Sequence, residues 1–398
     1  MNARSLLSGA FGVGTLAFVV LCPSVFGQGN DFRGLENRIQ ELFAEHRSAM
    51  VRVKAVYPPE APEEQKKAES GEEPLPQVVI GSGFFISREG LIITNASIVI
   101  NPLRVWVEHD SIAYGAEVIG YDKRSNVAFL RTHTLPDSFS FFHLVDRSGL
   151  PPIGSFLLRL SMPLEFKASP HFGMVSGFES RFGERFFPCL YIRTSIPAGP
   201  GDGGSAYLDL SGRLVGIQVG SLPDVGSSYI LPARAAMRIR DDILFSGSVT
   251  YGWIGFEVDV RSSVRNGRRL VLTEVFPDTP AEEVGLLDGD VLRRIGDYEI
   301  RTLDDLRNAI FYTRVGQYVD VLVQRDGEER LFNVRVAARP EDEPMEIVEP
   351  VPEGEPILNP LTDAAREQQE ETSGTRETEA EREAQGPPSR DGDSETGS

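Results

Sequence analysis

Residues 81–95 read GSGFFISREGLIITN, and this stretch decides the fold of the first half of the chain. It holds two short apolar runs, Gly83 to Ile86 and Leu91 to Thr94, separated by polar residues that end in Gly90. Short runs of apolar and β-branched residues bounded by turn residues are typical of β-strands. The stretch therefore predicts two short strands.

Similar runs continue along the chain as far as residue 244. They are Arg104 to Val107, Ala116 to Ile119, Val127 to Thr132, Phe156 to Leu160, Leu190 to Thr194 and Leu214 to Val219. Turn residues separate them at the spacing of an all-β barrel or sandwich, and helical periodicity is nearly absent before Ala233. We expect a mainly β domain here.

The segments that precede this domain fit the same interpretation. Apolar residues at helical spacing, followed by alternation over residues 49–55, predict a helix that leads into a strand; the helical set is Leu35, Ile39, Leu42 and Phe43. Residues 58–77 are rich in Pro, Glu and Lys, which is typical of a long solvated loop. Strands resume immediately after it, so we do not expect a domain boundary there.

From Gly252 the pattern changes to a compact mixed module. A Thr-Pro-Ala-Glu sequence at residues 279–282 is a capping box with proline at the first helical position. Thr302 caps a second predicted helix, and Asp326-Gly327 forms the turn of a predicted hairpin. The second half of the chain is therefore expected to be strand-rich with two helices.

Composition and charge bound the class of protein. The 398 residues suit two folded units, and 40% hydrophobic residues suffice for real cores. The net charge of -19 is concentrated after residue 340, where 18 Asp and Glu face 4 Arg, a net of -14 that leaves -5 for the rest. No Lys/Arg stripe is present, so we exclude nucleic-acid binding. The acidic tail, residues 341–398, is expected to be disordered.

The first 27 residues predict export. Arg4 precedes an apolar stretch densest from Leu16 to Leu21, and Val25 and Gly27 are the small residues of a signal cleavage site before Gln28. An uncleaved anchor is the alternative, and glycines that interrupt the apolar run count against it. We expect a periplasmic or cell-envelope protein with domains at 31–246 and 250–340, after a signal peptide at 1–27.

Two motifs resemble those of a known family. Gly81 to Ile86 followed by Gly90 to Asn95 is similar to the opening of the HtrA (Deg) protease domain, where Thr-Asn is followed by one residue and then the catalytic His; this chain has Ser97 there. Gly120 to Ser125 resembles the family stretch that ends in the catalytic Asp, and this chain has Asn126.

A third motif completes the resemblance. The segment from Ile192 to Ile217 matches without a gap the family segment that carries Gly-Asn-Ser-Gly-Gly. Here residues 201–205 read Gly-Asp-Gly-Gly-Ser, so the nucleophile position is Gly203. The order and spacing of the motifs hold from Leu35 to Arg339, which implies a trypsin-like double β-barrel followed by a PDZ domain, with all three triad positions replaced.

These three replacements remove the groups that a serine protease needs for catalysis. A serine hydroxyl becomes a nucleophile only when an imidazole removes its proton, and a carboxylate orients that imidazole. Gly203 has no side chain to acylate, and neither Ser97 nor Asn126 can act as a general base near neutral pH. Family sequence Gly-Asn-Pro-Phe-Gly is also replaced by Ser-Met-Pro-Leu-Glu at residues 161–165, which puts the substrate pocket in doubt.

A relocated catalytic centre is the alternative. Ser205 lies two residues past the nucleophile position, and the possible bases are His46, His109, His133, His143 and His171. Alternation along the following strand favours Ser205 as part of the barrel wall. No two histidines have the spacing of metal ligands and Cys189 is alone after signal cleavage, so we expect no metal, no cofactor and no internal disulfide.

The second domain carries its own resemblance. Residues 252–256, Gly-Trp-Ile-Gly-Phe, are similar to the carboxylate-binding loop of HtrA-type PDZ modules, and residues 303–310 correspond to the groove helix. A peptide would add as a strand beside the loop and place its terminal carboxylate on backbone N–H groups. The residues implied are Trp253, Ile254, Gly255, Phe256, Leu306 and Ile310. The alternative is that the apolar members are simply core.

These resemblances imply a binding protein in the cell envelope. The leading hypothesis is a pseudo-protease that captures peptides or unfolded protein C termini through its PDZ domain as a chaperone, an adaptor or a regulator of active relatives. Homo-trimers or assemblies with active HtrA proteins are the implied partners, and no nucleic acid or small-molecule cofactor is expected. The alternative is an active serine-type endopeptidase with a non-standard catalytic centre in protein quality control.

Overall fold

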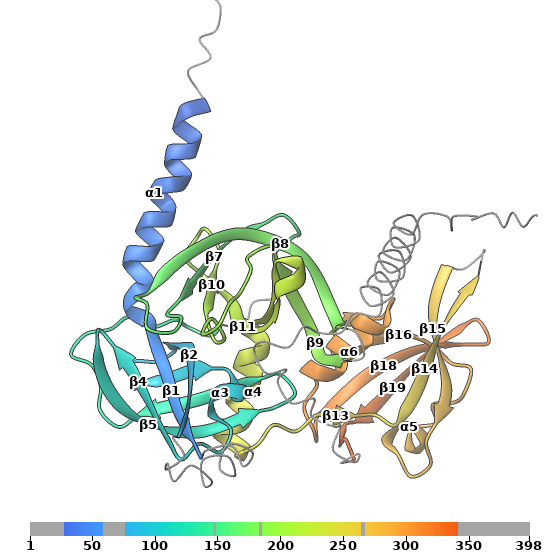
Figure 1. The fold of residues 1–398 in the computed structure, drawn as a ribbon. Helices are drawn as coiled ribbons and strands as arrows, with labels where there is room; N and C mark the ends of the chain where they lie inside the picture. Colours follow the sequence, from blue (N-terminus) through green and yellow to red (C-terminus); the bar gives the residue numbers. More distant parts are fainter. Residues whose placement is uncertain (1–27, 59–75, 146–148, 183–184, 264–266, 341–398) are drawn as a thin grey trace, which may run out of the picture. The chain divides into compact units, whose positions relative to one another are not determined.

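The computed structural model describes residues 28–58, 76–145, 149–182, 185–263 and 267–340 (Figure 1). The predicted signal peptide, most of the loop predicted at residues 58–77 and the acidic tail lie outside the described residues. Among the described residues, no helix is both long and apolar enough to cross a membrane.

The first barrel is a closed six-stranded sheet in the order β1-β2-β3-β6-β5-β4. Its strands are β1 (Met50–Tyr57), β2 (Gln77–Phe85), β3 (Leu91–Thr94), β4 (Arg104–His109), β5 (Ile112–Asp122) and β6 (Val127–Thr132). The two runs that open the sequence analysis are β3 and the end of β2, and they pair in antiparallel fashion. Alternating burial along β4 places Val105 and Val107 inside the barrel and half-buried Trp106 on the other face.

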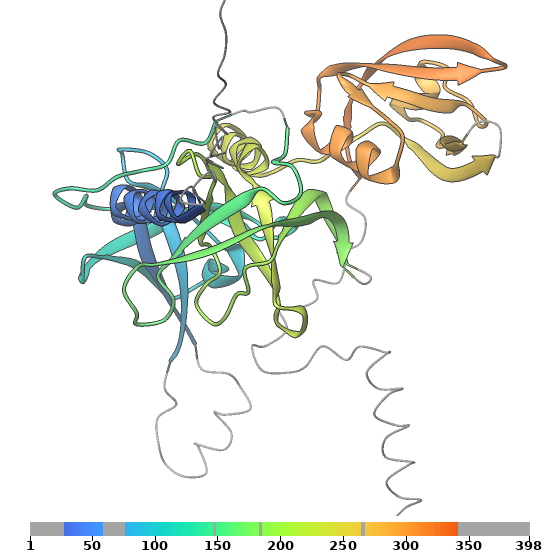
Figure 2. The same cartoon turned by 90° about the horizontal axis from the view of Figure 1, so that it is seen from above.

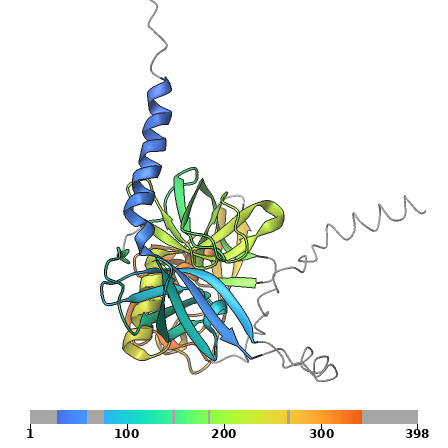
Figure 3. The ribbon, with the colours of Figure 1, turned by 60° about the vertical axis from the view of Figure 1, so that its left-hand side comes forward.

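Three short or peripheral helices accompany this barrel. They are α1 (Gln28–His46), η1 (Arg47–Ala49) and α3 (Ala96–Val99). Helix α1 runs outward from the barrel (Figures 1 and 3), and its C-terminal part is the part that packs: Leu42 is fully buried, while Phe32 remains 76% exposed. Helix α1 thus contains the predicted helical stripe, but only one end of that stripe reaches the core.

The second barrel is also closed, in the order β10-β11-β12-β9-β8-β7. Its elements are β7 (Phe156–Ser161), β8 (Ser169–Phe182), β9 (Arg185–Thr194), β10 (Ala206–Leu208), β11 (Leu214–Leu222), η2 (Pro223–Val225), β12 (Ser227–Pro232) and α4 (Ala233–Ser246). The pair β8 and β9 is the longest of this barrel (Figure 2). The sequence pattern does not predict β8, because Pro170, Gly173 and Gly177 interrupt its apolar residues.

One hydrophobic core joins the two barrels. It includes Phe84 and Phe129 from the first barrel, Leu158 and Leu160 from the second, and Ile239 from α4, all fully buried. Smaller cores fill the interior of each barrel. The trypsin-like double barrel predicted from the sequence is therefore confirmed.

The PDZ domain is a sheet with two helices, as predicted. Its main sheet has the order β14-β15-β16-β18-β19, β17 pairs with β16, and β13 pairs with β20. The elements are β13 (Gly252–Trp253), β14 (Phe256–Ser263), β15 (Gly267–Val275), α5 (Pro280–Glu283), β16 (Val291–Ile295), β17 (Tyr298–Glu299), α6 (Leu303–Tyr312), β18 (Tyr318–Arg325), β19 (Glu328–Arg335) and β20 (Ala337–Ala338).

Helix caps and turns in this domain follow the local sequence. Half of the capping box predicted at residues 279–282 is formed: the Thr279 hydroxyl accepts from the backbone N–H of Glu282 at the start of α5, but the Glu282 carboxylate accepts from the N–H of Asp278. Thr302 and Asp305 form a reciprocal capping box at the start of α6. The β18–β19 turn has φ 53° at Asp326 and 89° at Gly327, the left-handed pair expected of a tight hairpin turn.

Helix α6 also contacts the second barrel. The Arg307 guanidinium donates to the backbone oxygen of Ser180 at 3.1 Å and lies over the Phe186 ring at 4.7 Å. Phe311, near the end of α6, is 1% exposed, and the Arg238 guanidinium of α4 lies 4.6 Å from its ring centroid. One helix thus belongs to the PDZ core on one face and to the barrel surface on another.

The capping box gives a stability prediction for the PDZ domain. Thr302→Ala should lower the free energy of unfolding by about 1 kcal/mol, because the N–H of Asp305 loses its acceptor. Thr302→Ser keeps the hydroxyl and is the matched control, expected within about 0.5 kcal/mol of the parent. Urea unfolding monitored by circular dichroism measures both. Equal stability of the alanine and serine variants would contradict the assignment.

Candidate functional site

Asn126 connects the two barrels at one of the three positions singled out by resemblance. It occupies the turn between β5 and β6 with φ 57°, a left-handed conformation that Asn tolerates. Its Oδ1 accepts from the backbone N–H of Ser97 at 2.9 Å, and its Nδ2 donates to the backbone oxygen of Val219 at 2.9 Å. Because Val219 lies on β11, this amide uses both of its ends as a structural bridge.

Gly203 lies in a loop that is bonded to the first barrel. The N–H of Ser82, on β2, donates to the carbonyl of Gly203 at 2.8 Å, and the Ser82 hydroxyl donates to the carbonyl of Gly201 at 2.9 Å. Gly204 has φ 87°, and a Cβ built on it would lie 2.1 Å from the Ser82 carbonyl oxygen. Only glycine fits at this point of contact between the barrels.

The space in front of Gly203 is occupied by neighbours of Ser97. A Cβ built on Gly203 would lie 2.8 Å from Nδ2 of Asn95 and 3.9 Å from Cδ1 of Ile98. Asn95 is only 5% exposed. The structure thus brings the three positions into one neighbourhood, in which the Asn95 amide fills the volume next to the Gly203 α-carbon.

A buried ion pair between Arg159 and Asp202 holds the same loop in place. Arg159 is 1% exposed on β7, and its guanidinium lies 3.1 Å from the Asp202 carboxylate and donates to the carbonyl of Pro197 at 2.6 Å. Asp202 also accepts from the N–H of Gly199 at 2.9 Å. Such a pair is costly to bury, and removing one partner leaves an uncompensated charge. Arg159 therefore fixes the loop from residue 197 to residue 202.

Further polar groups complete this interior network. Gln218 Oε1 accepts from Arg159 at 3.4 Å and from the Tyr207 hydroxyl at 3.3 Å. Burial raises the pKa of Tyr207 to about 12, so its hydroxyl stays protonated and can donate. Sequence reasoning missed this network, although one signal was present: Arg159 is the single charged residue in the apolar run Phe156 to Leu160.

The groups considered for a relocated catalytic centre have other roles. Ser205 is fully buried, and its hydroxyl donates to the backbone oxygen of Asp202. Burial, and after it the Arg159 guanidinium, lower the pKa of His171, while Asp202 opposes the shift. Burial raises the pKa of the Cys189 thiol, so it is not activated. Among the described residues, no group of three or more His, Cys, Asp or Glu side chains could hold a metal ion.

The loop at residues 252–256 forms a turn that backbone hydrogen bonds fix to neighbouring segments of the domain. Gly255 has φ 100°, and its carbonyl accepts from the N–H of Phe276 at 3.0 Å. The carbonyl of Ile254 accepts from the N–H of Ala281 at 2.9 Å. Trp253 stacks on Phe276 with ring centroids 5.9 Å apart. With the carbonyls of Ile254 and Gly255 bonded toward the domain, the loop is anchored beside the first residue of β14.

An apolar face lies where this loop meets α6. Strand β14 is an edge strand of the PDZ sheet, so one of its sides is open to an added strand. Half-buried Phe256 of β14 and half-buried Leu306 and Ile310 of α6 pack against the domain core. Ile254 is 2% exposed and lies inside that core. Sequence reasoning did not include Leu303, which is 43% exposed at the start of α6.

Comparisons with known families cover both domains. The family described as "Trypsin-like peptidase domain" matches residues 81–217, and the family described as "PDZ domain" matches residues 252–336. The first match contains Ser97, Asn126 and Gly203, and the second contains the loop at 252–256 and helix α6.

Curated relatives match over most of the folded chain. A protein of Marinomonas sp. (strain MWYL1) named "Probable periplasmic serine endoprotease DegP-like" is 29% identical over 276 residues, which cover 66% of this chain and 58% of the relative. A protein of the same name in Chlamydia muridarum is 27% identical and covers 65% and 54%. The chain thus spans little more than half the length of these relatives.

Solved structures share the fold. The structure titled "HtrA-type protease AlgW with decapeptide" superposes with a TM-score of 0.58 at 21% identity, covering 76% of this chain and 99% of that one. The structure titled "Crystal structure of the serine endoprotease from Yersinia pestis" gives a TM-score of 0.52 at 19% identity, covering 76% and 98%.

The bridge made by Asn126 gives a testable consequence. Asn126→Asp should lower the free energy of unfolding at pH 7 by about 1–3 kcal/mol, because a carboxylate cannot donate to the Val219 carbonyl and places a charged acceptor against it. Asn101→Asp is the matched control, since Asn101 has a similar φ of 52° but is exposed. Chemical denaturation measures both; an Asn126→Asp protein as stable as the control would refute the bridge.

Proposed function

We propose that this chain, which carries a trypsin-like peptidase domain and a PDZ domain and is similar to DegP-like endoproteases, binds the C termini of peptides or unfolded proteins without cleaving them. One observation carries the proposal: Gly203 stands at the nucleophile position, and its α-carbon faces the Asn95 amide. No acyl-enzyme can form on glycine, because it has no nucleophilic side-chain atom.

The other two triad positions support the same conclusion. The Asn126 side chain is engaged at both ends by backbone groups, and Ser97 supplies one of them through its N–H. Neither side chain can remove a proton near neutral pH. An endopeptidase with a rebuilt centre is the alternative, which the names of the relatives favour. It would need another nucleophile, and the buried Ser205 hydroxyl is bonded to Asp202.

Binding through the PDZ domain rests on the open edge of β14. An extended peptide placed there would gain main-chain hydrogen bonds, and its last side chain would pack on Phe256, Leu306 and Ile310. Ile254 would contribute through its backbone, because its side chain belongs to the core. We therefore propose C termini that end in an apolar residue as ligands.

Location and assembly extend the proposal. The signal peptide predicted at residues 1–27 and the periplasmic names of the relatives support an envelope location. Self-association, as a homo-trimer or with active relatives, is supported by exposed Phe156 and Phe172, whose rings lie 5.1 Å apart on β7 and β8. Met174, 42% exposed, extends the same apolar surface.

The binding proposal is tested with a peptide library on the full mature chain. Peptides ending in a free apolar residue should bind, and C-terminal amidation should weaken them by at least about tenfold, because the carboxylate contacts are lost. Leu306→Arg should weaken binding by a similar factor, since it places a charge in the apolar face.

The matched control is Leu331→Arg, which introduces the same charge at a 57% exposed position on β19. It should leave affinity within about twofold of the parent. Fluorescence anisotropy gives the four dissociation constants: those of the free and the amidated peptide with the parent chain, and those of the free peptide with each of the two variants. Binding that is insensitive both to amidation and to Leu306→Arg would rule out the PDZ groove as the site.

A further inference from the structure

Strand β14, at the edge of the PDZ sheet, carries charges in a fixed order on its exposed face. Phe256 and Val258 pack against the domain core. Side chains of a strand alternate between its two faces, so Glu257, Asp259 and Arg261 lie on the other face, and all three are exposed. Reading away from the loop that precedes β14, two carboxylates are therefore followed by one guanidinium.

The alternation is regular along β14 because the register shift of the β14–β15 pair lies on β15 (Figure 1). Glu257 is paired with Glu274, and Val258 is paired with Leu272, so the extra residue of this bulge is Thr273. Strand β14 has no inserted residue at this point. A strand added at its free edge would consequently meet the charges at intervals of two residues.

Positive charge is concentrated at the far end of β14. Arg261 lies directly opposite Arg269 of β15, and the exposed Arg268 is the next residue along. Like charges directly opposite each other in a sheet are unfavourable. Within the part of the chain that the structure describes, none of these three guanidiniums forms an ion pair, and the buried Nε of Arg269 has no hydrogen-bond partner. This end of the strand pair therefore favours an acidic group from a ligand.

Negative charge is concentrated at the near end of β14. Glu257 lies opposite Glu274 of β15, and both are exposed. The Asp259 carboxylate accepts from the N–H of Val260 at 2.7 Å, which keeps this charge close to the main chain of the strand. Neither Glu257 nor Asp259 forms an ion pair with another described residue. The near end therefore favours basic groups from a ligand.

We propose that this order of charges selects among the C termini bound in the PDZ groove, and favours peptides with basic residues one and three places before the last residue and an acidic residue five places before it. The inference rests on the proposed function, which puts the last residue of the peptide beside Phe256. The peptide then runs antiparallel to β14, because its C terminus lies at the loop where β14 begins. Its third and fifth places lie opposite Asp259 and Arg261, with their side chains on the same face of the sheet.

The charge order adds a second criterion to the apolar last residue. The last side chain packs on the groove face with Phe256, whereas the charged side chains lie on the opposite face of β14. Each cross-strand pair of charges changes the affinity by only a small factor. Two pairs that are attractive in one peptide and repulsive in the reversed peptide together give a ratio large enough to measure.

Two ten-residue peptides of identical composition test the proposal on the full mature chain. Both end in a free valine; the first has lysine three places before the valine and glutamate five places before it, and the second has these two residues exchanged. Fluorescence anisotropy should show that the first peptide binds at least about fivefold more tightly. In about 1 M NaCl the ratio should fall below about twofold, because salt screens exposed charges.

A charge reversal on β14 identifies the residue responsible. Arg261→Glu should bring the two affinities within about twofold of each other, because the glutamate of the first peptide now meets a carboxylate and the lysine of the second peptide gains one. Arg330→Glu is the matched control, since it makes the same change at a 44% exposed side chain on β19, the strand at the other edge of the sheet. It should keep a ratio of at least about fivefold. Circular dichroism checks that both variants are folded.

Amidation of the peptides separates a failure of this inference from a failure of the proposed function. Binding that amidation weakens, with equal affinities of the two peptides for the parent chain, would leave the groove in place and refute the charge order. Absence of binding, or binding that amidation does not change, would refute the groove and the charge order together. A preference that survives Arg261→Glu unchanged would also overturn the assignment to β14.

Discussion

The close contact between Ser82 of the first barrel and the loop carrying Gly203 and Gly204 is the constraint on which the site depends. Ser82 uses its N–H and its hydroxyl to hold two carbonyls of that loop, and its own carbonyl leaves no room for a side chain at Gly204. Hydrogen bonds of this kind are individually modest, but leaving such buried groups unpaired is expensive. The loop is therefore held in one conformation by both barrels.

A loop held in this way can serve catalysis or stability, and its surroundings decide which. The buried Arg159 guanidinium is paired with Asp202, and the Asn126 amide is hydrogen-bonded to two backbone groups. The Asn95 side chain fills the space beside Gly203. A peptidase would need an activated oxygen, a base and free volume at the same place. Here the Asn126 amide joins the two barrels, while Arg159 and Asp202 hold the loop within the second barrel, and the proposed binding function rests on this use of the side chains.

The sequence allowed much of the fold to be predicted, because local patterns determine local elements. The runs at 91–94 and 127–132 became β3 and β6 with the predicted bounds, and the Thr302 cap begins α6. Strand β8 escaped prediction because proline and glycines break its alternation. Tertiary contacts were equally inaccessible: the two partners of the Asn126 amide lie 29 and 93 residues away.

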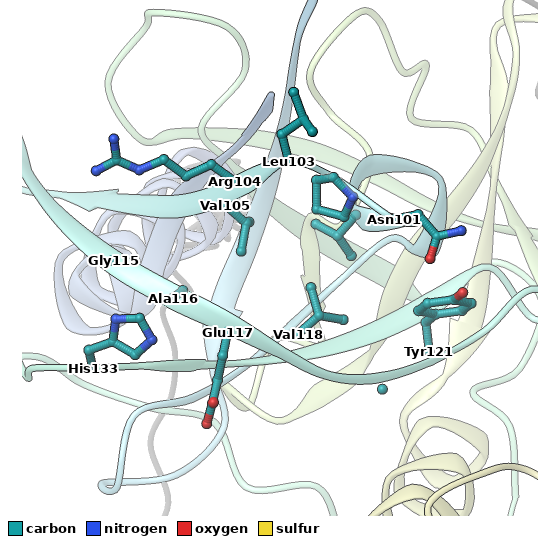
Figure 4. A pocket seen from close by; sticks show the side chains of 13 residues that line it. Asn101, Leu103, Arg104, Val105, Gly115, Ala116, Glu117, Val118, Tyr121 and His133 are labelled. Atoms are coloured by element: carbon teal, nitrogen blue, oxygen red, sulfur yellow. The ribbon is translucent and has the colours of Figure 1, made fainter. Parts of the chain in front are cut away.

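The candidate sites could also be predicted only in part. The three positions identified by resemblance do lie together, but sequence reasoning could not show that Ile254 is core, since burial depends on how α5 and α6 cover the loop. The hollow between β4 and β5, which is lined by Val105, Val118 and Tyr121 (Figure 4), could not be predicted either. Both strands have ordinary patterns, and the hollow lies where their pairing ends, at Trp106 and Gly115.

The central claim is that no residue of the barrels attacks a peptide bond, and mass spectrometry of an unfolded substrate tests it most directly. The mature chain, purified free of other proteases, is incubated for a day with reduced, carboxymethylated α-lactalbumin. The account predicts that the substrate mass stays intact and that a fluorophosphonate probe leaves the chain unlabelled. Cleavage products or labelling that disappear in a Ser205→Ala variant would contradict it.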